Sequence, residues 1–338
     1  MRVTIAQINP VVGDVEGNTS KIEEALSGCG ASGTDLLVFP ELSLVGYPPG
    51  DLLTRDWFID LTEKALERIL AISTKYPEIG IIYGAPTRRR EEGGKGLYNT
   101  ALMVSNGRVL GMRHKTLLPS YDLFNEERYF QKGAEMNPIS FKGKKIGLLV
   151  GEDSWSDRRL WPDGKWAKRD PLAELEEEGV TILINISASP FYLGQDELRY
   201  ELLRRHSVKY QKPFLYVNQI GANDELIFDG RSIAFNQKGE IIGSCSPFEE
   251  QLLTVEMNRT GQTKRYQPGA RMETLYQALV LGIRDYMRKT GFSRALVGLS
   301  GGIDSALTCC LAVGAVGREN VTGVSLPSLY SPPESVED

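Results

Sequence analysis

Residues 145–151, KIGLLVG, form the stretch that decides the fold, an apolar run of strand length that ends in glycine. Two similar runs precede it, LLVFPE at 36–41 and RVLGMRHK at 108–115, which end at Glu41 and Lys115. Apolar runs of this length that alternate with helix-like stretches predict an α/β protein. Because open α/β sheets assemble their sites beyond strand ends, we expect Glu41, Lys115 and Gly151 to come together.

Composition and charge exclude several classes of protein. The chain has 338 residues, of which 41% are hydrophobic and 25% charged, as is usual for a folded protein of two or three domains. Its 39 Lys and Arg against 44 Asp and Glu give a net charge of −5, so we expect no nucleic-acid partner. No run approaches the ~20 apolar residues of a membrane span, and the first residues, MRVTIAQI, indicate a strand and not a signal peptide. We therefore expect a cytoplasmic protein without a membrane partner.

Metal and disulfide sites are not expected either. The four cysteines lack C-x-x-C or zinc spacing, which is typical of free thiols in a reducing compartment, and there are only two histidines. The acidic run DELIFDG contains Asp224, Glu225 and Asp229, oxygen ligands that a divalent cation could use. We interpret this run as structural, with metal binding as the less favoured alternative.

Elements alternate along the chain, and a polar segment divides it. We expect a first domain over 1–255, a linker over 256–272 and the start of a second domain over 273–338. Short turns at SNGRV (105–109) and NQKGE (236–240) predict antiparallel hairpins. The expected strands are 2–7, 36–39, 80–84, 99–104, 109–115, 145–150, 181–185, 214–217, 233–235, 240–244, 295–299 and 321–327. The expected helices are 17–28, 56–76, 170–178, 196–210, 273–291 and 306–317, so the second domain should begin helix–strand–helix–strand. Because 66 residues are too few to cover both faces of a doubly wound sheet, we expect the chain to stop within its second domain.

The segments FPE (39–41), RHKTLLP (113–119) and GEDSW (151–155) resemble, in order and spacing, the Glu, Lys and Cys sites of the carbon–nitrogen hydrolase (nitrilase) superfamily. The resemblance implies a four-layer α-β-β-α sandwich over about 1–255. It implies Glu41 as the general base, Lys115 as the group that stabilises the oxyanion, and residue 151 as the nucleophile. Residue 151 is glycine, which cannot form a thioester, so we expect this half of the protein to be inactive as a glutaminase. Neither Cys29 nor Cys245 follows one of these strand ends, and we expect neither to replace the missing thiol.

A second motif, SGGIDS at 300–305, follows the expected strand ALVGL and precedes the apolar stretch ALTCCLAVGAVG. Consecutive glycines at a strand-to-helix turn let several backbone N–H groups converge on an anion such as pyrophosphate. The motif lacks the lysine of a Walker A loop and resembles the PP-loop of N-type ATP pyrophosphatases, a doubly wound fold of the adenine nucleotide alpha hydrolase type. That resemblance implies ATP, accompanied by Mg²⁺, at Gly298, Ser300, Gly301, Gly302, Asp304 and Ser305.

The two motifs in this order resemble the glutamine-dependent NAD synthetase family. The stretches 118–130, 187–194, 223–232 and 326–338 extend the resemblance over the whole chain. It implies ATP-dependent amidation of deamido-NAD with ammonia from glutamine, in a homo-oligomer.

The same resemblance implies that Tyr121 and Ser189 hold glutamine. Gln195 stands where the family has Lys or Arg, in an expected turn. Gln195 and Gly151 leave open an ammonia-dependent synthetase that keeps an inactive first domain as a scaffold. A stand-alone amidase is a further alternative, against which SGGIDS argues.

Overall fold

The computed structural model describes residues 1–30, 32–89, 96–155, 169–261 and 265–327. The chain forms two compact units, Met1–Ile220 with Phe228–Pro268, and Gly221–Ile227 with Gly269–Asp338. The division after Pro268 falls inside the expected linker 256–272, and the domain limits themselves stay a prediction.

Unit 1 is built on two six-stranded sheets. The first has the order β14-β1-β2-β3-β4-β5, with β14 Gln251–Glu256, β1 Arg2–Gln7, β2 Leu36–Val38, β3 Gly80–Arg88, β4 Leu97–Ser105 and β5 Arg108–His114. The second has the order β13-β12-β9-β8-β7-β6, with β13 Ile241–Ser244, β12 Ile233–Phe235, β9 Phe214–Asn218, β8 Ile182–Ser187, β7 Lys144–Val150 and β6 Ile139–Phe141. The helices of this unit are α1 Val15–Cys29, α2 Asp56–Ser73, α3 Pro171–Glu177 and α4 Gln195–Tyr210.

Strand direction places several carboxyl ends at one edge of each sheet. In the first sheet β1, β2 and β3 are parallel, and β4 and β5 return antiparallel, so β5 runs in the direction of β3. In the second sheet β7, β8 and β9 are parallel. The β4–β5 and β12–β13 pairs are antiparallel, which confirms the two hairpins expected from their turns.

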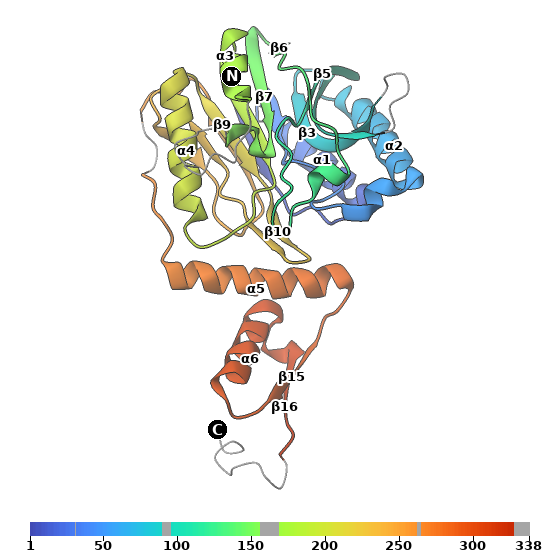
Figure 1. Ribbon diagram of the computed structural model, residues 1–338, viewed down its shortest axis with the longest axis vertical. Helices are drawn as coiled ribbons and strands as arrows, with labels where there is room; N and C mark the ends of the chain where they lie inside the picture. The colour runs from blue at the N-terminus through green and yellow to red at the C-terminus, as the bar shows by residue number, and fades with distance from the viewer. Residues whose placement is uncertain (31, 90–95, 156–168, 262–264, 328–338) are drawn as a thin grey trace. The chain divides into compact units, whose positions relative to one another are not determined.

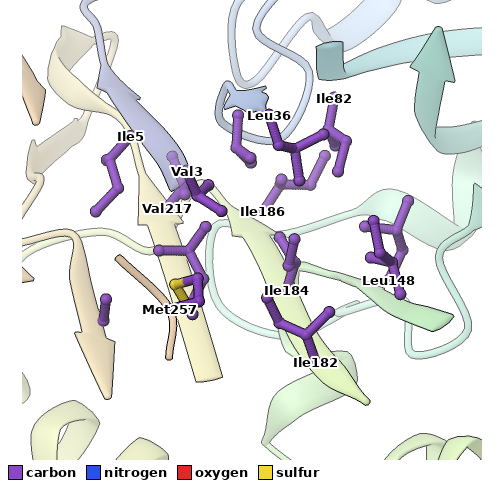
Figure 2. Close-up of a cluster of buried hydrophobic side chains, with 14 of the residues drawn as sticks. Val3, Ile5, Leu36, Ile82, Leu148, Ile182, Ile184, Ile186, Val217 and Met257 are labelled. Atoms are coloured by element: carbon purple, nitrogen blue, oxygen red, sulfur yellow. The ribbon is translucent and has the colours of Figure 1, made fainter. Parts of the chain in front are cut away.

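The two sheets pack face to face through aliphatic side chains. Figure 2 shows Val3, Leu36 and Ile82 of the first sheet near Ile184 and Ile186 of the second, all within one buried cluster. On the outer faces α2 packs on β3 and β4, and α4 packs on β9. Figure 1 shows α2 on one side of unit 1 and α3 and α4 on the other, which confirms the four-layer α-β-β-α sandwich.

The expected strand list omits an important edge strand. β14 pairs antiparallel with the whole of β1, from Arg2 opposite Glu256 to Gln7 opposite Gln251. Only Val255 along it is buried, as is usual for an edge strand, although its sequence QLLTVE contains as many apolar residues as that of β1. The short strands β6, β10 (Ile220–Asn223) and β11 (Leu226–Asp229) are also absent from the expected list.

Unit 2 contains α5 (Arg271–Thr290), β15 (Ala295–Leu299), α6 (Ile303–Val316) and β16 (Val321–Ser325), all labelled in Figure 1. β15 and β16 are parallel, and α6 packs on both strands and on α5. This helix–strand–helix–strand order confirms the expected start of a doubly wound domain. Within the described part of the chain, no helix combines the length and apolar character that crossing a bilayer requires.

The tip of the β10–β11 hairpin belongs to unit 2 because α5 holds its backbone. Asp285 accepts a hydrogen bond of 2.8 Å from the backbone N–H of Ala222. The Lys289 ammonium donates to the Ala222 carbonyl at 3.0 Å and to Asn223 Oδ1 at 2.9 Å. A buried acid and its neighbouring lysine thus fix the hairpin tip to the helix.

Candidate functional site

The structure brings the three strand ends together, as their sequence pattern predicts. Glu41 follows β2, Lys115 directly follows β5, and Gly151 begins the 3₁₀ turn Gly151–Ser154 after β7. Glu41 is 1% exposed and Lys115 2%, which is exceptional for charged residues and requires partners.

Lys115 lies between two carboxylates. Its Nζ donates to Glu41 Oε1 at 2.7 Å and to Glu126 Oε1 at 2.8 Å. Burial alone would lower the pKa of Lys115, but the carboxylates of Glu126 and Glu41 outweigh it and raise the pKa well above its usual range. Lys115 is therefore a permanent cation at this site.

Glu126 is the second acid at the site, and the sequence analysis does not single it out. Burial, with the nearby Glu41 charge, raises its pKa to about 7, although Lys115 acts in the opposite direction. The Tyr47 hydroxyl also donates to Glu126 Oε1, at 2.7 Å. Glu126 lies in the stretch 118–130, LPSYDLFNEERYF, where a second acid, Glu127, follows it and is exposed, so residue type alone could not distinguish them.

Glu41 is held in one orientation by two further donors. Asn99 Nδ2 donates to its Oε1 at 2.7 Å, and the backbone N–H of Ala188, just beyond β8, donates to its Oε2 at 3.0 Å. The Glu41 carboxylate thus accepts hydrogen bonds from residues of both sheets, which fixes its position between the two sheets.

Gly151 has a left-handed backbone, with φ of +55°, and any side chain there would point at the charged pair. An ideal Cβ on Gly151 would lie 2.6 Å from Lys115 Nζ and 2.7 Å from Glu41 Oε2. The position is therefore adjacent to both the acid and the ammonium. A side chain at 151 fits only if the end of Lys115 moves aside.

Asp153 ties the strand ends to one another. Its Oδ1 accepts the backbone N–H groups of Thr116 and Leu117, each at 2.9 Å, and its Oδ2 accepts that of Val150 at 3.2 Å. One buried carboxylate therefore fixes the backbone on the far side of Lys115 and the residue before Gly151. The segment GEDSW contains this aspartate, but its spacing gives no sign of the role.

The three expected glutamine contacts differ in their surroundings. Tyr121 is about half exposed, and its hydroxyl donates to the Glu152 carboxylate beside Gly151. Ser189 is buried and exchanges hydrogen bonds with Asn218, its N–H donating at 2.8 Å. Gln195 is the buried first residue of α4, so the expectation that it lies in a turn is wrong.

Asp229, at the end of the acidic run, forms a buried ion pair. Asp229 is fully buried and accepts two hydrogen bonds from Arg199 Nη2, at 2.8 and 2.7 Å, whereas Asp224 and Glu225 are exposed. Among the residues whose positions are described, no three His, Cys, Asp or Glu side chains gather in a way that could hold a metal ion.

The SGGIDS segment in unit 2 forms an exposed strand-to-helix loop. Gly301 has φ of +75°, Gly302 caps α6, and Gly298 lies within β15. The Ser305 hydroxyl donates to the Gly302 carbonyl at 2.9 Å and lies 3.2 Å from the Ser300 backbone N–H, which it accepts. The loop thus exposes the start of a helix, where backbone N–H groups favour an anion.

Two different protein families match the two parts of the chain. Residues 2–265 match the family model "Carbon-nitrogen hydrolase", and residues 275–338 match "NAD synthase". A glutamine-dependent NAD(+) synthetase of Synechocystis sp. is 41% identical over 344 residues, covering 99% of this chain and 61% of the relative. One of Thermotoga maritima is 36% identical, covering 100% and 62%. The chain therefore spans about three fifths of the length of these curated relatives.

Solved structures give the same picture. A glutamine-dependent NAD+ synthetase from Acinetobacter baumannii in complex with ADP has a TM-score of 0.89 and 35% identity, covering 99% of this chain and 61% of that one. An amidase from Nesterenkonia sp., at 23% identity and a TM-score of 0.63 over 75% of this chain and 89% of its own, shares the fold of unit 1. Since the first family model matches well over half of the residues, this chain belongs to the carbon–nitrogen hydrolase family.

Proposed function

We propose that this protein acts in glutamine-dependent NAD synthesis, the ATP-dependent amidation of deamido-NAD with ammonia from glutamine. The observation that carries the proposal is the presence, in one chain, of a buried Glu–Lys site next to residue 151 and a glycine loop at a strand-to-helix turn. The synthetase relatives extend over both parts. A stand-alone amidase would have no use for the second motif.

The geometry of unit 1 supports an acid–base role for Glu41. In the family's reaction a carboxylate takes the proton of a thiol, the thiolate attacks an amide carbon, and an ammonium stabilises the oxyanion. Glu41 Oε2 and Lys115 Nζ both lie within 3 Å of the point where a side chain at 151 would begin. Because glycine supplies no thiol, we propose that glutamine is not hydrolysed by this route in this chain.

Glutamine itself would be held at the mouth of this site by Tyr121 and Ser189. The Tyr121 hydroxyl and the Glu152 carboxylate beside it offer partners for the charged end of an amino acid, and Ser189 follows the same strand end as Ala188. Gln195 would contribute a side-chain amide, a weaker contact for a carboxylate than the cation that the family has at this position.

The glycine loop of unit 2 would bind the phosphates of ATP. Ser300, Gly301, Gly302 and Ser305 present backbone and hydroxyl donors at the start of α6, and Asp304 lies in its first turn. Magnesium would arrive with ATP and screen the phosphate charge. We propose these small molecules as substrates and a homo-oligomer as the assembly.

One observation favours a second candidate, synthesis from free ammonia with unit 1 as an inactive scaffold. Glu41, Lys115 and Glu126 form a hydrogen-bonded set that is complete without any side chain at 151. Unit 1 can therefore keep its fold and its buried charges while lacking a nucleophile.

An electrophilic glutamine analogue distinguishes the two candidates. We expect no covalent adduct with this chain, and an adduct mapped by mass spectrometry to position 151 in Gly151→Cys, accompanied by ammonia release from glutamine. The double variant Gly151→Cys/Glu41→Gln controls for the base and should lose both. No adduct in Gly151→Cys would favour the scaffold, whereas glutamine hydrolysis by the unaltered chain that depends on Glu41 would overturn the proposal for residue 151.

A further inference from the structure

Unit 1 contains a polar cavity whose lining includes none of the residues of the Glu41–Lys115 site. It has a volume of about 280 Å³ and lies where the start of α4, β12, the end of β13 and residues 265–267 meet. Arg199, Arg231 and Arg265 line it together with one acid, Asp196. We call it the arginine cavity.

Cationic groups outnumber acids in the lining of the arginine cavity. Besides Asp196, which lines it, the only acid that contacts these arginines in the described contacts is Asp229, on which Arg199 Nη2 spends its hydrogen bonds. The lining of this partly enclosed space thus contains three guanidinium groups, of which that of Arg265 is exposed, and one carboxylate, with Asp229 and the exposed Glu197 as further acids nearby. Such a space attracts an anion, because low-dielectric walls strengthen the field.

Two arginines still have donors to offer. Arg199 is 2% exposed, and its Nη1 makes no hydrogen bond of good geometry among the described residues, although the nearby Tyr216 hydroxyl interacts with this guanidinium. Arg231 forms two long ion pairs, from Nη1 to Asp196 Oδ2 at 3.5 Å and from Nε to Asp229 Oδ2 at 3.4 Å. Neither contact gives Nε a hydrogen bond of good geometry among the described residues. A buried guanidinium donor without an acceptor is costly, which points to an acceptor that comes from outside the chain.

The backbone of Arg231 is strained. Its φ of +53° is uncommon for a residue with a side chain. The neighbouring glycine, Gly230, also has a positive φ, of +68°, so the chain turns sharply here and directs Arg231 to the cavity. Strain of this kind gathers at ligand sites more often than elsewhere.

The opposite wall is aromatic. The rings of Tyr200 and Tyr266 stack at 4.1 Å, and the Tyr266 hydroxyl donates to Asp196 at 2.9 Å, which partly satisfies that acid. The cavity therefore combines guanidinium donors with a flat apolar surface. Its volume suits a small ligand, since larger organic ligands occupy about 300–1,000 Å³.

From these contacts we propose that the arginine cavity binds a small carboxylate or phosphate anion, with Arg231 and Arg265 as its main ligands. The site is separate from both proposed substrate sites and directly contacts the first turns of α4, the helix that begins at Gln195. An anion bound there would supply an acceptor for Arg231 Nε, which has no hydrogen bond among the described residues.

Calorimetric titration of the whole chain tests the proposal, with inorganic phosphate and benzoate as separate probes at constant ionic strength set by chloride. We expect at least one probe to show a binding event that is at least tenfold weaker in Arg231→Gly and Arg265→Ala, whereas phosphate bound at the glycine loop of unit 2 should be the same in all variants. Glycine accepts the positive φ at 231, so that variant should remain folded; if circular dichroism shows otherwise, Arg265→Ala decides. Arg205→Ala, on the exposed part of α4, is the matched control and should bind like the parent chain.

The two probes separate phosphate from carboxylate as the preferred anion. No binding of either probe by the parent chain would overturn the proposal. Equal binding by the parent chain, Arg231→Gly and Arg265→Ala would also overturn it, because the anion would then bind elsewhere.

Discussion

Replacing Glu126 by glutamine should change how the stability of unit 1 depends on pH. The pKa of this acid is about 7 in the folded protein against 4.5 for an ordinary glutamate. The folded state therefore holds the proton more tightly, and the group's contribution is fully present below pH 4.5 and lost as pH rises through about 7. At 1.36 kcal/mol per pH unit, the difference corresponds to about 3 kcal/mol of unfolding free energy.

Glu126→Gln removes this titration but keeps the shape of the side chain. Between pH 4.5 and pH 8 the parent chain should lose about 3 kcal/mol of stability relative to the variant, measured by urea unfolding at a series of pH values. The fluorescence of Trp155, which is buried beside the site, offers a local signal. Glu127→Gln is the matched control, because the neighbouring Glu127 is exposed and forms an exposed ion pair with Lys132. Parallel pH profiles for the parent chain and Glu126→Gln would refute the reasoning.

Three further substitutions test other parts of the structure. Gly151→Ala should destabilise unit 1 by about 1–3 kcal/mol, because φ is +55° and the added Cβ meets Lys115; a melting temperature equal to that of the parent chain would contradict this. Asp153→Ala should cost more than about 3 kcal/mol, because three buried N–H groups lose their acceptor, whereas Asp170→Ala, a helix cap, should cost about 1 kcal/mol in the same unfolding assay. Asp285→Ala should release the hairpin tip, seen as faster amide hydrogen exchange at Ala222 than in Arg284→Ala.

The sequence is sufficient for the sandwich and for the meeting of its strand ends. The bounds of β1 and β15 are predicted to the residue. Each is a short apolar run that ends at polar or turn-forming residues, and these residues mark where the strand stops. β14 is missed although its sequence QLLTVE contains three apolar residues, because it adjoins the polar segment assigned to the linker. β14 pairs with β1, which lies some 250 residues away in the sequence. A local sequence pattern cannot predict a pairing between segments so far apart.

In the candidate site, too, some residues can be predicted from the local sequence and others cannot. Glu41, Lys115 and Gly151 are found because each follows a strand. Glu126 is not found because it lies in a loop, where neighbouring acids look alike in the sequence and only the fold decides which of them is buried. The orientation of Glu41 by Ala188 likewise depends on the packing of one sheet against the other.

The same geometry explains why this fold tolerates glycine at position 151. Two buried carboxylates around one ammonium would carry a net negative charge, but the raised pKa of Glu126 lets that acid stay partly protonated near neutral pH, which reduces the imbalance. Lys115 reaches both acids at hydrogen-bond distance, and its Nζ lies 2.6 Å from the point where a Cβ at 151 would be. A cysteine at 151 would have to displace the lysine from that position and would bring a second titrating group beside Glu41. The charges of this site thus stabilise one another without a nucleophile, so the retention of Glu41 and Lys115 does not by itself require that glutamine be hydrolysed here.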